Sequence, residues 1–389
     1  MLDFTYYTPT KVFFGKGTQQ RLSEIVAEYG FRRVMLQYGK NSIKKSGLYD
    51  EIMASLQKSG ITVVEMGGVE PNPKVDFVRR AAKLAREEQV ELILAVGGGS
   101  VIDSAKTTAL AAANEHDIFD MMMGKAKPTA ALPVGCVLTH AAAGSEMSAS
   151  AVLTNTELGV KKGIGTDLNR PLFAICNPEL TFTLPAYQTA CGVVDIMAHT
   201  MERYFTVCPP TDLTDRISES LLKSVISAAR VLLREPRDYD ARATVMWASS
   251  ISHNGLTGCG RENALAVHQL EHAVSGRFDH VAHGAGLAVL FPAWASYVLP
   301  HNVPRLAQFA RRVFDVTEAD DLAAAKAGIA AMSRFFTELG MPQRLSEFDI
   351  PRNALPDLAD LASFGGTRVV KSYAPLDRAA MLAIFEACY

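Results

Sequence analysis

Short apolar runs alternate with amphipathic stretches through the first half of the chain. The apolar runs have the length and composition of buried strands and lie at 33–38, 61–65, 92–96 and 131–138. Between them, apolar residues recur with helical spacing over 18–29, 44–58, 74–88 and 100–113. This alternation predicts an α/β fold, in which helices cover both faces of a parallel sheet. Ligands of such sheets bind at the carboxyl ends of the strands.

The pattern changes near residue 184, and helical periodicity then continues to the C-terminus. Pro185 suits the start of a helix, because its ring fixes the backbone in a helix-compatible conformation. We therefore expect two domains, an α/β domain over 1–183 and an all-α domain over 184–389, with the active cleft between them. The first helices expected in the second domain are 186–204, 212–233, 241–256 and 264–274.

Composition and charge exclude several classes of partner. The 389 residues carry a formal net charge of −2, and charges of both signs are mixed along the chain. This argues against nucleic acid or an anionic membrane as the main partner. No apolar run approaches the ~20 residues of a membrane span, and the N-terminus lacks the pattern of a signal peptide. The cysteines include no C-x-x-C pair, so we expect reduced thiols and a cytoplasmic protein.

A glycine-rich turn follows the third apolar run and leads into an alanine-rich helix. Glycine lets the backbone approach a ligand closely, and the first N–H groups of a helix attract anions. The sequence therefore predicts a phosphate or pyrophosphate site at this turn, with a hydroxyl donor from its serine. The residues of the turn are Gly97, Gly98, Gly99 and Ser100.

Acidic and histidine side chains recur in pairs within the apolar helices of the second half. The pairs are Asp195 with His199, His268 with His272, and His280 with His283. The first two pairs are four residues apart and so share a helix face. Polar groups without partners are costly among apolar neighbours, and a divalent metal would satisfy several of them together. One carboxylate and three imidazoles suit Zn(II) or Fe(II), whereas a single helical histidine is more often a surface or core residue.

Four segments together resemble the iron-dependent (group III) alcohol dehydrogenase family. They are GGGSVIDSAK at 97–106, LTHAAAGSEM at 138–147, GVVDIMAH at 192–199, and HQLEH at 268–272 followed by His283-Gly284. Segments 38–48 and 71–73 are most similar to its NADPH-dependent butanol dehydrogenase branch. The resemblance spans nearly the whole chain. It implies a Rossmann-like nucleotide-binding domain (1–183), a helical metal-binding domain (184–389) in a dehydroquinate synthase-like architecture, and a homodimer.

The resemblance also implies roles for the histidine pairs. His272 would lie beside the metal as a catalytic residue that handles protons near the nicotinamide. The last two ligands are one residue further apart than is usual in the family, which an insertion near His280 would explain. Gly284, which follows His283, favours His283 over His280. The metal ligands implied in this way are Asp195, His199, His268 and His283.

Nucleotide choice depends on the turn after the first strand of the α/β pattern. An acidic residue there selects NAD by binding the ribose 2′-hydroxyl. This turn is Gly39, Lys40, Asn41 and Ser42, without a carboxylate, so NADP is favoured. Lys40, Lys44 or Lys45 would balance the 2′-phosphate, unless they are ordinary surface lysines.

Further cofactor contacts follow from the resemblance. His140 stands where relatives usually carry threonine or an apolar residue, so it either alters the nicotinamide pocket or fills a gap. Asp103, with Lys106, structures the phosphate loop or forms an ordinary pair on a helix surface. The remaining contacts are expected from Asn72, Thr139 and Lys161.

The sequence as a whole predicts a metal-dependent NADP(H) alcohol dehydrogenase or aldehyde reductase. Hydride would pass between the nicotinamide C4 and a carbonyl carbon while the metal polarises the oxygen. The segments expected near the substrate are apolar or small, which favours a short aliphatic or aromatic aldehyde. Ni(II) and Mn(II) can also use these ligands. The N-terminal strand at 11–14 either crosses to a second subunit or is an ordinary edge strand.

Two other enzyme classes fit parts of the sequence. A lyase of the dehydroquinate synthase type holds NAD and a metal, but needs a basic phosphate-binding cluster that is missing near the histidines. The segment 268–272 fits the H-x-x-E-H pattern of certain zinc peptidases. That interpretation leaves the glycine turn and Asp195 unexplained.

Overall fold

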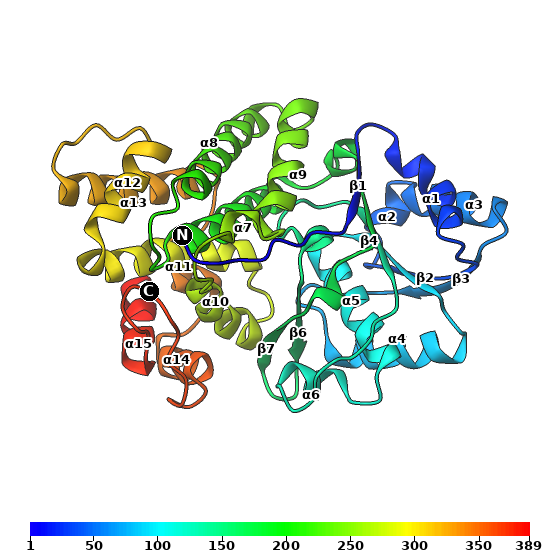
Figure 1. Ribbon diagram of the computed structural model, residues 1–389. Helices are drawn as coiled ribbons and strands as arrows, with labels where there is room; N and C mark the ends of the chain where they lie inside the picture. Colours follow the sequence, from blue (N-terminus) through cyan, green and yellow to red (C-terminus); the bar gives the residue numbers. More distant parts are fainter. The chain divides into compact units, whose positions relative to one another are not determined.

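The computed structural model describes residues 1–389 as two compact units. One unit is Tyr7–Leu184, and the other combines Met1–Tyr6 with Pro185–Tyr389 (Figure 1). The first six residues therefore pack with the helical part of the chain. The backbone N–H of Leu2 donates to the carbonyl of Gly260 at 2.9 Å.

The Tyr7–Leu184 unit is built on a six-stranded sheet in which every pair of neighbouring strands is parallel, as the sequence predicted. In spatial order the strands are β1 (Lys11–Phe14), β8 (Phe173–Cys176), β5 (Val134–Leu138), β4 (Leu92–Gly97), β2 (Arg33–Tyr38) and β3 (Thr62–Gly67). The helices are α1 (Leu22–Glu28), α2 (Ser42–Lys45), α3 (Leu48–Lys58), α4 (Val75–Glu87), α5 (Gly99–Ala113) and α6 (Ile118–Met122).

Helices cover both faces of this sheet (Figure 1). Alternate residues of the strands point to opposite faces. On one face, Val34 and Leu36 of β2 share a core with Ile52 of α3. On the other face, the amide of Gln37 donates to the Thr108 hydroxyl of α5 at 3.1 Å. The fully buried strands explain why the sequence shows continuous apolar runs instead of alternation.

Strand order identifies the ligand-binding edge of the sheet. The chain forms β2, adds β3 on one side, and then crosses to place β4 on the other side of β2. In doubly wound sheets, ligands bind at the carboxyl ends of the two strands where the winding direction reverses. Tyr38 and Val96, at the ends of β2 and β4, are register partners. The turn at 39–42 and the glycine turn at 97–100 therefore leave the sheet side by side.

A two-stranded hairpin and one sheet strand were missed in the sequence. The hairpin joins β6 (Ser150–Asn155) to antiparallel β7 (Val160–Gly165), with Gly159 at φ 63° in the turn. Its alternation is weak, because β7 contains two adjacent lysines and two glycines and only two apolar residues. Strand β8 has only four residues, too short for periodicity to distinguish it from a loop.

The second unit is helical, which confirms the predicted fold class. Helix α7 (Ala186–Tyr204) has the predicted bounds, and Pro185 stands at its N-cap position. The other helices are α8 (Asp212–Arg234), α9 (Tyr239–His253), α10 (Ala266–Arg277), α11 (His283–Val298), α12 (Val303–Val313), α13 (Asp321–Glu338), α14 (Leu355–Ser363) and α15 (Arg378–Ala387).

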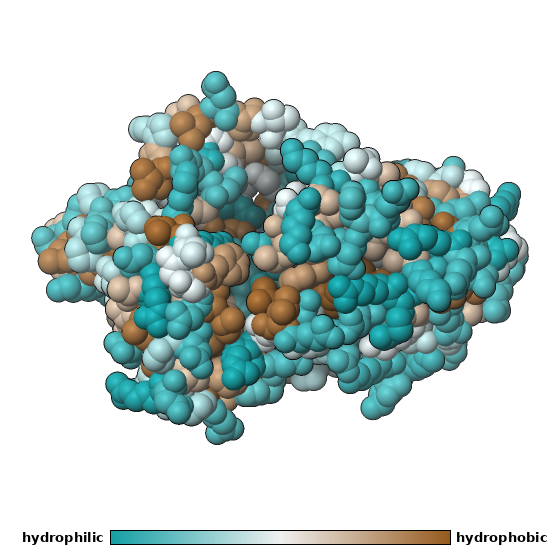
Figure 2. Space-filling model, turned by 90° about the horizontal axis from the view of Figure 1, so that it is seen from below, coloured by the Kyte–Doolittle hydropathy of each residue, from teal (hydrophilic) through white to brown (hydrophobic).

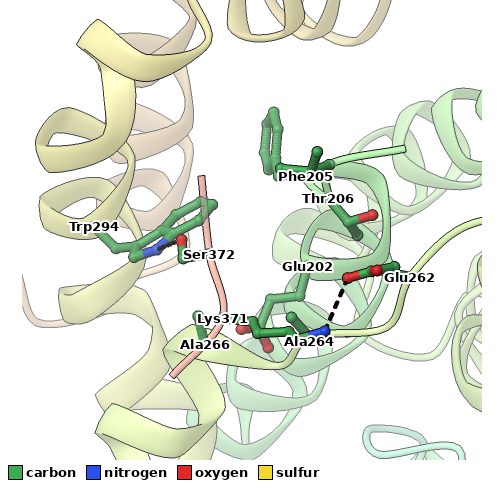
Figure 3. A pocket seen from close by; sticks show the side chains of 10 residues that line it. Glu202, Phe205, Thr206, Glu262, Ala264, Ala266, Trp294, Lys371 and Ser372 are labelled. Atoms are coloured by element: carbon green, nitrogen blue, oxygen red, sulfur yellow. Dashed lines mark hydrogen bonds and ion pairs between the residues drawn. The ribbon is translucent and has the colours of Figure 1, made fainter. Parts of the chain in front are cut away.

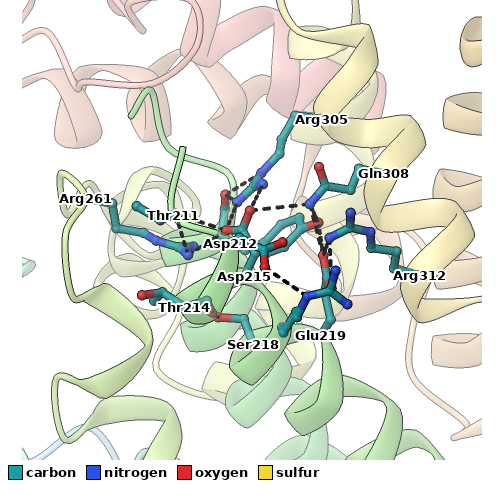
Figure 4. A network of polar contacts seen from close by, with 12 residues as sticks. Thr211, Asp212, Thr214, Asp215, Ser218, Glu219, Arg261, Arg305, Gln308 and Arg312 are labelled. Atoms are coloured by element: carbon teal, nitrogen blue, oxygen red, sulfur yellow. Dashed lines mark hydrogen bonds and ion pairs between the residues drawn. The ribbon is translucent and has the colours of Figure 1, made fainter. Parts of the chain in front are cut away.

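Two arginines stabilise the buried C-terminal end of α7 (Figure 4). Arg261 donates to the carbonyl of Arg203 at 3.1 Å, and Arg305 donates to the carbonyl of Tyr204 at 3.0 Å. Both guanidinium groups also bind Asp215, at 2.6 Å. The last carbonyls of a helix lack partners within it and carry partial negative charge. This cluster therefore anchors the helix that carries Asp195.

No helix of the structure has the length and apolar character needed to cross a bilayer. Hydrophilic residues cover most of the face seen in Figure 2, with apolar residues scattered among them.

Candidate functional site

The predicted metal ligands come together around the Asp195 carboxylate. Its Oδ1 lies 3.1 Å from His199 Nδ1, 3.4 Å from His268 Nε2 and 3.8 Å from His283 Nε2. Asp195, His199 and His268 are buried, and His283 is partly buried. The structure therefore groups one carboxylate with three imidazoles, which come from α7, α10 and α11.

Local sequence explains why these side chains converge. Asp195 and His199 are one turn apart on α7, while His268 lies in the first turn of α10 and His283 opens α11. Gly284 lets α11 start directly against α7. A Cβ there would lie 2.1 Å from the backbone oxygen of Cys191, one turn before Asp195.

His280 lies outside this group. Its Nε2 bonds to the carbonyl oxygen of Phe348 at 2.8 Å, and its side chain is exposed. His280 lies in the turn before α11, which begins at His283. Of the two candidates, His283 is the one that faces Asp195.

The donor set fits a divalent cation. Asp195 Oδ1 and His268 Nε2 are buried without a hydrogen-bond partner. Native proteins rarely leave such atoms unpaired, because burying them without a partner is costly. A cation that accepts both lone pairs would remove this cost. One carboxylate oxygen with imidazole nitrogens is a ligand set that Zn(II) and Fe(II) use.

Electrostatics also favours a cation. Burial lowers the pKa of His199 to about 4, so this ring is neutral at pH 7, as a metal ligand must be. Burial opposes the charge of Asp195, but the histidines around it hold its pKa well below the usual value. Burial also opposes the charge of His268, but Glu202 and Asp195 raise its pKa to about 9. The carboxylates around His268 therefore favour a positive charge at this position.

His272 lies beside the group formed by Asp195 and the three histidines. Its ring centroid lies 5.7 Å from that of His283 and 6.4 Å from that of His268. The ligand atoms of His272, Glu271 and His283 lie within 4.8 Å of one another, separately from the cluster of Asp195, His199 and His268. His272 is partly exposed, which suits a residue that exchanges protons.

The glycine turn is a crowded backbone site in the other unit. A Cβ on Gly97 would lie 2.5 Å from the Val101 side chain, and one on Gly98 would lie 2.9 Å from Cβ of His140. The N–H of Thr139 donates to the carbonyl of Gly97 at 3.0 Å. The predicted residues Thr139 and His140 therefore pack directly on the turn, next to the N-terminus of α5.

Asp103 and Lys106 lie beneath this turn. Lys106 is fully buried, which rules out the surface-pair interpretation. Its Nζ donates to the hydroxyl of Ser145 at 2.9 Å, and the same hydroxyl donates to Asp103 at 2.6 Å. The Asp103 carboxylate also accepts from the N–H of Val152 at 2.9 Å. The two residues join α5 to 145–152, and burial lowers the pKa of Lys106 to about 8.

Other predicted cofactor residues form two contacts. Lys161 donates to the side-chain oxygen of Asn72 at 3.0 Å, and Asn72 has an unusual positive φ of 51°. Lys40 pairs with Glu70 at 2.8 Å. Sequence reasoning missed Glu70, because this carboxylate comes from the turn after the neighbouring strand β3.

Comparison with known protein families identifies the family to which the chain belongs. The model of iron-containing alcohol dehydrogenases matches residues 9–178, and the model of the C-terminal domain of Fe-containing alcohol dehydrogenases matches residues 189–389. The chain belongs to the iron-containing alcohol dehydrogenase family. The predicted resemblance is thereby confirmed, and the chain is an oxidoreductase of the alcohol dehydrogenase and aldehyde reductase type.

Individual members of this family agree over the full length. The probable NADH-dependent butanol dehydrogenase 1 of Bacillus subtilis is 43% identical over 100% of both chains. The NADPH-dependent aldehyde reductase YqhD of Escherichia coli is 38% identical over 92% of each chain. The crystal structure of NADH-dependent butanol dehydrogenase A from Thermotoga maritima has a TM-score of 0.96 and 36% identity, covering 100% of this chain and 99% of its own.

Three further residues contact the predicted metal ligands. Glu202 and Glu271 bind the Nδ1 atoms of His268 and His283. The ring of His253 lies 4.1 Å from that of His199. Since Glu271 is fully buried against His283, it is not placed to activate water as the glutamate of an H-x-x-E-H peptidase would.

Proposed function

We propose that this protein is a metal-dependent alcohol dehydrogenase and aldehyde reductase that uses NADP(H) and acts on small aliphatic or aromatic substrates. Asp195, His199, His268 and His283 hold the metal. The observation that carries the proposal is the buried Asp195 carboxylate among three imidazoles, with Asp195 Oδ1 and His268 Nε2 left unbonded. When bound, a divalent cation supplies Lewis-acid polarisation of the substrate oxygen, and the nicotinamide supplies or accepts the hydride.

Asp195 and His272 have further roles in the proposed reaction. Asp195 contributes the negative charge that retains a cation among neutral imidazoles. His272, partly exposed beside His283, takes up or delivers the proton of the alcohol oxygen. Residues 184–389 in this proposal form the metal-binding domain.

Residues 1–183 in the same proposal bind the nucleotide. Gly97, Gly98 and Gly99 admit the pyrophosphate to the N-terminus of α5, where Ser100 adds a hydroxyl. Support comes from the crowding at Gly97 and Gly98, where a Cβ would lie less than 3.0 Å from a neighbouring side chain. The other cofactor contacts are Gly39, Lys40, Asn41, Ser42, Asn72, Asp103, Thr139, His140 and Lys161.

Selection of NADP(H) rests on the turn after β2. Gly39 offers no carboxylate to the ribose 2′-hydroxyl, and Lys40 lies beside it. Glu70 acts against this preference, because it neutralises Lys40. Relatives with both nucleotide preferences are known by name: the Bacillus relative is named as NADH-dependent and the Escherichia relative as NADPH-dependent.

A homodimer is part of the proposal. Strand β1 pairs with β8 along one side only and is one of the two edge strands of the sheet, with β3 at the other edge. Aromatic side chains on β1 and shortly before it in the same unit are exposed, with Phe14 at 39% and Tyr7 at 52%. A strand edge and aromatic side chains left exposed together favour association with a second copy.

The experiment that tests the function is aldehyde reduction followed by cofactor absorbance. Butyraldehyde is supplied with NADPH or NADH, with and without a chelator. We expect turnover that is faster with NADPH and lost after chelation. No turnover with either nucleotide, after Zn(II) or Fe(II) has been added, would contradict the proposal, whereas equal rates would contradict only the nucleotide preference.

A further inference from the structure

Each of the three histidines that face Asp195 has its Nδ1 atom occupied. His199 Nδ1 lies 3.0 Å from the backbone carbonyl oxygen of Asp195. His268 Nδ1 bonds to Glu202, and His283 Nδ1 bonds to Glu271. The Nε2 atoms of His268 and His283 are the ones that approach Asp195, at 3.4 and 3.8 Å.

The two glutamates determine which ring nitrogen carries the proton. A carboxylate only accepts hydrogen bonds, so its imidazole partner must be protonated on Nδ1. In a neutral ring this leaves the lone pair on Nε2, the atom that faces Asp195. Glu202 and Glu271 thus orient His268 and His283 and fix the tautomer that can bind a metal through Nε2.

Glu202 is itself held rigidly. It lies one turn after His199 on α7 and is 2% exposed. Its second oxygen accepts the backbone N–H of Val267 at 2.5 Å and that of His268 at 3.4 Å. These N–H groups belong to the first turn of α10, where helices lack internal acceptors. One side chain therefore caps α10 and orients the histidine in its first turn.

Glu271 is fixed by the neighbouring helix. It lies one turn after His268 on α10 and is fully buried. A Cβ on Gly286 of α11 would lie 3.0 Å from Glu271 Cγ and 3.2 Å from its Oε1. The absence of a side chain at Gly286 thus makes room for the carboxylate that holds His283.

We propose that Glu202 and Glu271 are positioning residues that set metal affinity through His268 and His283. This inference rests on the proposed metal site. Partners of this kind, which bind the second nitrogen of a ligand histidine, typically contribute 10–100-fold in metal affinity.

The surroundings of Glu202 suggest a graded variant. Glu202 lines a cavity of about 30 Å³ together with Glu262, Trp294 and Lys371 (Figure 3). Such a volume can hold a water molecule. Shortening Glu202 to aspartate withdraws the carboxylate from His268 but leaves space in which water can replace part of the contact. Glu202→Asp should therefore fall between the wild type and Glu202→Gln.

The test measures the dissociation constant of Zn(II) by chelator competition with the full-length protein. In Glu202→Gln, an amide oxygen that keeps capping α10 turns its NH2 group toward His268, which favours the wrong tautomer. We expect Glu202→Gln and Glu271→Gln to bind Zn(II) about 10–100-fold more weakly. Glu219→Gln is the matched control. Glu219 is a buried glutamate that binds Tyr204 at 2.8 Å and none of the histidines, so its variant should keep wild-type affinity.

A second measurement needs no variant. Long-range ¹⁵N NMR of histidine-labelled, Zn(II)-loaded wild type should show His268 and His283 protonated on Nδ1. Unchanged affinity in both glutamine variants, or Zn(II) bound through Nδ1, would overturn the inference while the metal site stands. A wild type that binds no divalent metal would overturn the proposed function as well.

Discussion

Asp195 Oδ1 and His268 Nε2 lie 3.4 Å apart in the protein interior, and neither atom forms a hydrogen bond. The two residues come from different helices that meet through Glu202 and the start of α10. The relationship explains why charged and polar groups persist in helices that are otherwise apolar.

Removing a metal-ligating side chain should lower turnover without weakening nucleotide binding. Asp195→Asn and His268→Ala should lose the metal, and turnover should fall by about 10³-fold, because Lewis-acid polarisation is worth several kcal/mol. The affinity for NADPH, measured by fluorescence, should change little, since the nucleotide contacts proposed for 1–183 are untouched. Equal loss of metal binding and nucleotide binding in both variants would contradict the assignment of these residues to the metal.

Gly284 should tolerate no side chain. Gly284→Ala places a methyl group 2.1 Å from the backbone oxygen of Cys191, so α11 must move away from α7 and take His283 with it. We expect a loss of about 1–3 kcal/mol in the free energy of unfolding, from urea titration, together with weaker metal binding. Gly165→Ala is the control, because a Cβ there meets nothing within 4 Å. Wild-type metal affinity in Gly284→Ala would show that this helix contact does not position His283.

Asp215 should stabilise the helical unit in a pH-dependent manner. Burial raises the pKa of its carboxyl, but Arg305 and Arg261 more than offset this and hold the pKa below its ordinary value of 3.8. A depressed folded-state pKa contributes stability that is complete above the unfolded value and is lost as the pH falls through the folded value. Asp215→Asn should therefore cost about 3–5 kcal/mol at pH 7, since it leaves two guanidinium groups without their counter-charge.

The difference in the free energy of unfolding between Asp215→Asn and wild type should shrink as the pH falls below 3.8, because the carboxyl of the unfolded chain is then protonated while the native carboxylate keeps its lowered pKa. Urea titrations at pH 7 and pH 3 measure this difference in the free energy of unfolding. Asp212→Asn serves as the control, because its side chain is 69% exposed and pairs only with Arg216. A difference that stays constant at both pH values would show that charge at Asp215 does not matter.

Gly39→Asp should shift nucleotide preference from NADPH toward NADH. A side chain fits there, because its Cβ would lie 3.7 Å from the Val69 carbonyl oxygen, an ordinary contact. The new carboxylate would repel a 2′-phosphate and bind a 2′-hydroxyl, so the ratio of kcat/KM values should change by at least about tenfold. Gly39→Asn adds the same shape without charge and should shift the ratio much less. An unchanged ratio in Gly39→Asp would place the 2′-phosphate elsewhere.

Freeing Lys40 from its ion pair with Glu70 should strengthen the preference for NADPH. Glu70→Gln removes the carboxylate that pairs with Lys40 at 2.8 Å and leaves the ammonium group available to a 2′-phosphate. We expect a lower KM for NADPH, with kcat and the KM for NADH little changed. Steady-state kinetics with both nucleotides tests this, and equal changes in the two KM values would show that Glu70 does not act through the 2′-phosphate.

The sequence was most informative where local pattern and tertiary environment agree. Strand 33–38 and helix 186–204 have the predicted bounds, because a fully buried strand is apolar throughout and Pro185 marks the helix start. Hairpin 150–165 was missed, because its second strand is polar and glycine-containing. Its position matters for the proposed cofactor site, since it brings Lys161 to Asn72.

Within the candidate site, helical spacing was enough to pair Asp195 with His199. It was not enough to find Glu202, which lies 66 residues from its partner His268 in sequence. Glu271 looked like part of a peptidase motif, because only the folded chain shows that it binds His283. Residues that act through another residue have no spacing signature of their own, and the packing of α7, α10 and α11 is needed to identify them.

A titration of metal-free protein with Zn(II) or Fe(II), with butyraldehyde reduction by NADPH as the readout, tests whether the metal is needed for turnover. We expect the metal-free protein to be inactive and turnover to rise with added metal until each chain holds a single ion. In His268→Ala the same titration should restore no activity. Full turnover by the metal-free protein would show that Asp195 and the three histidines do not hold a metal required for catalysis.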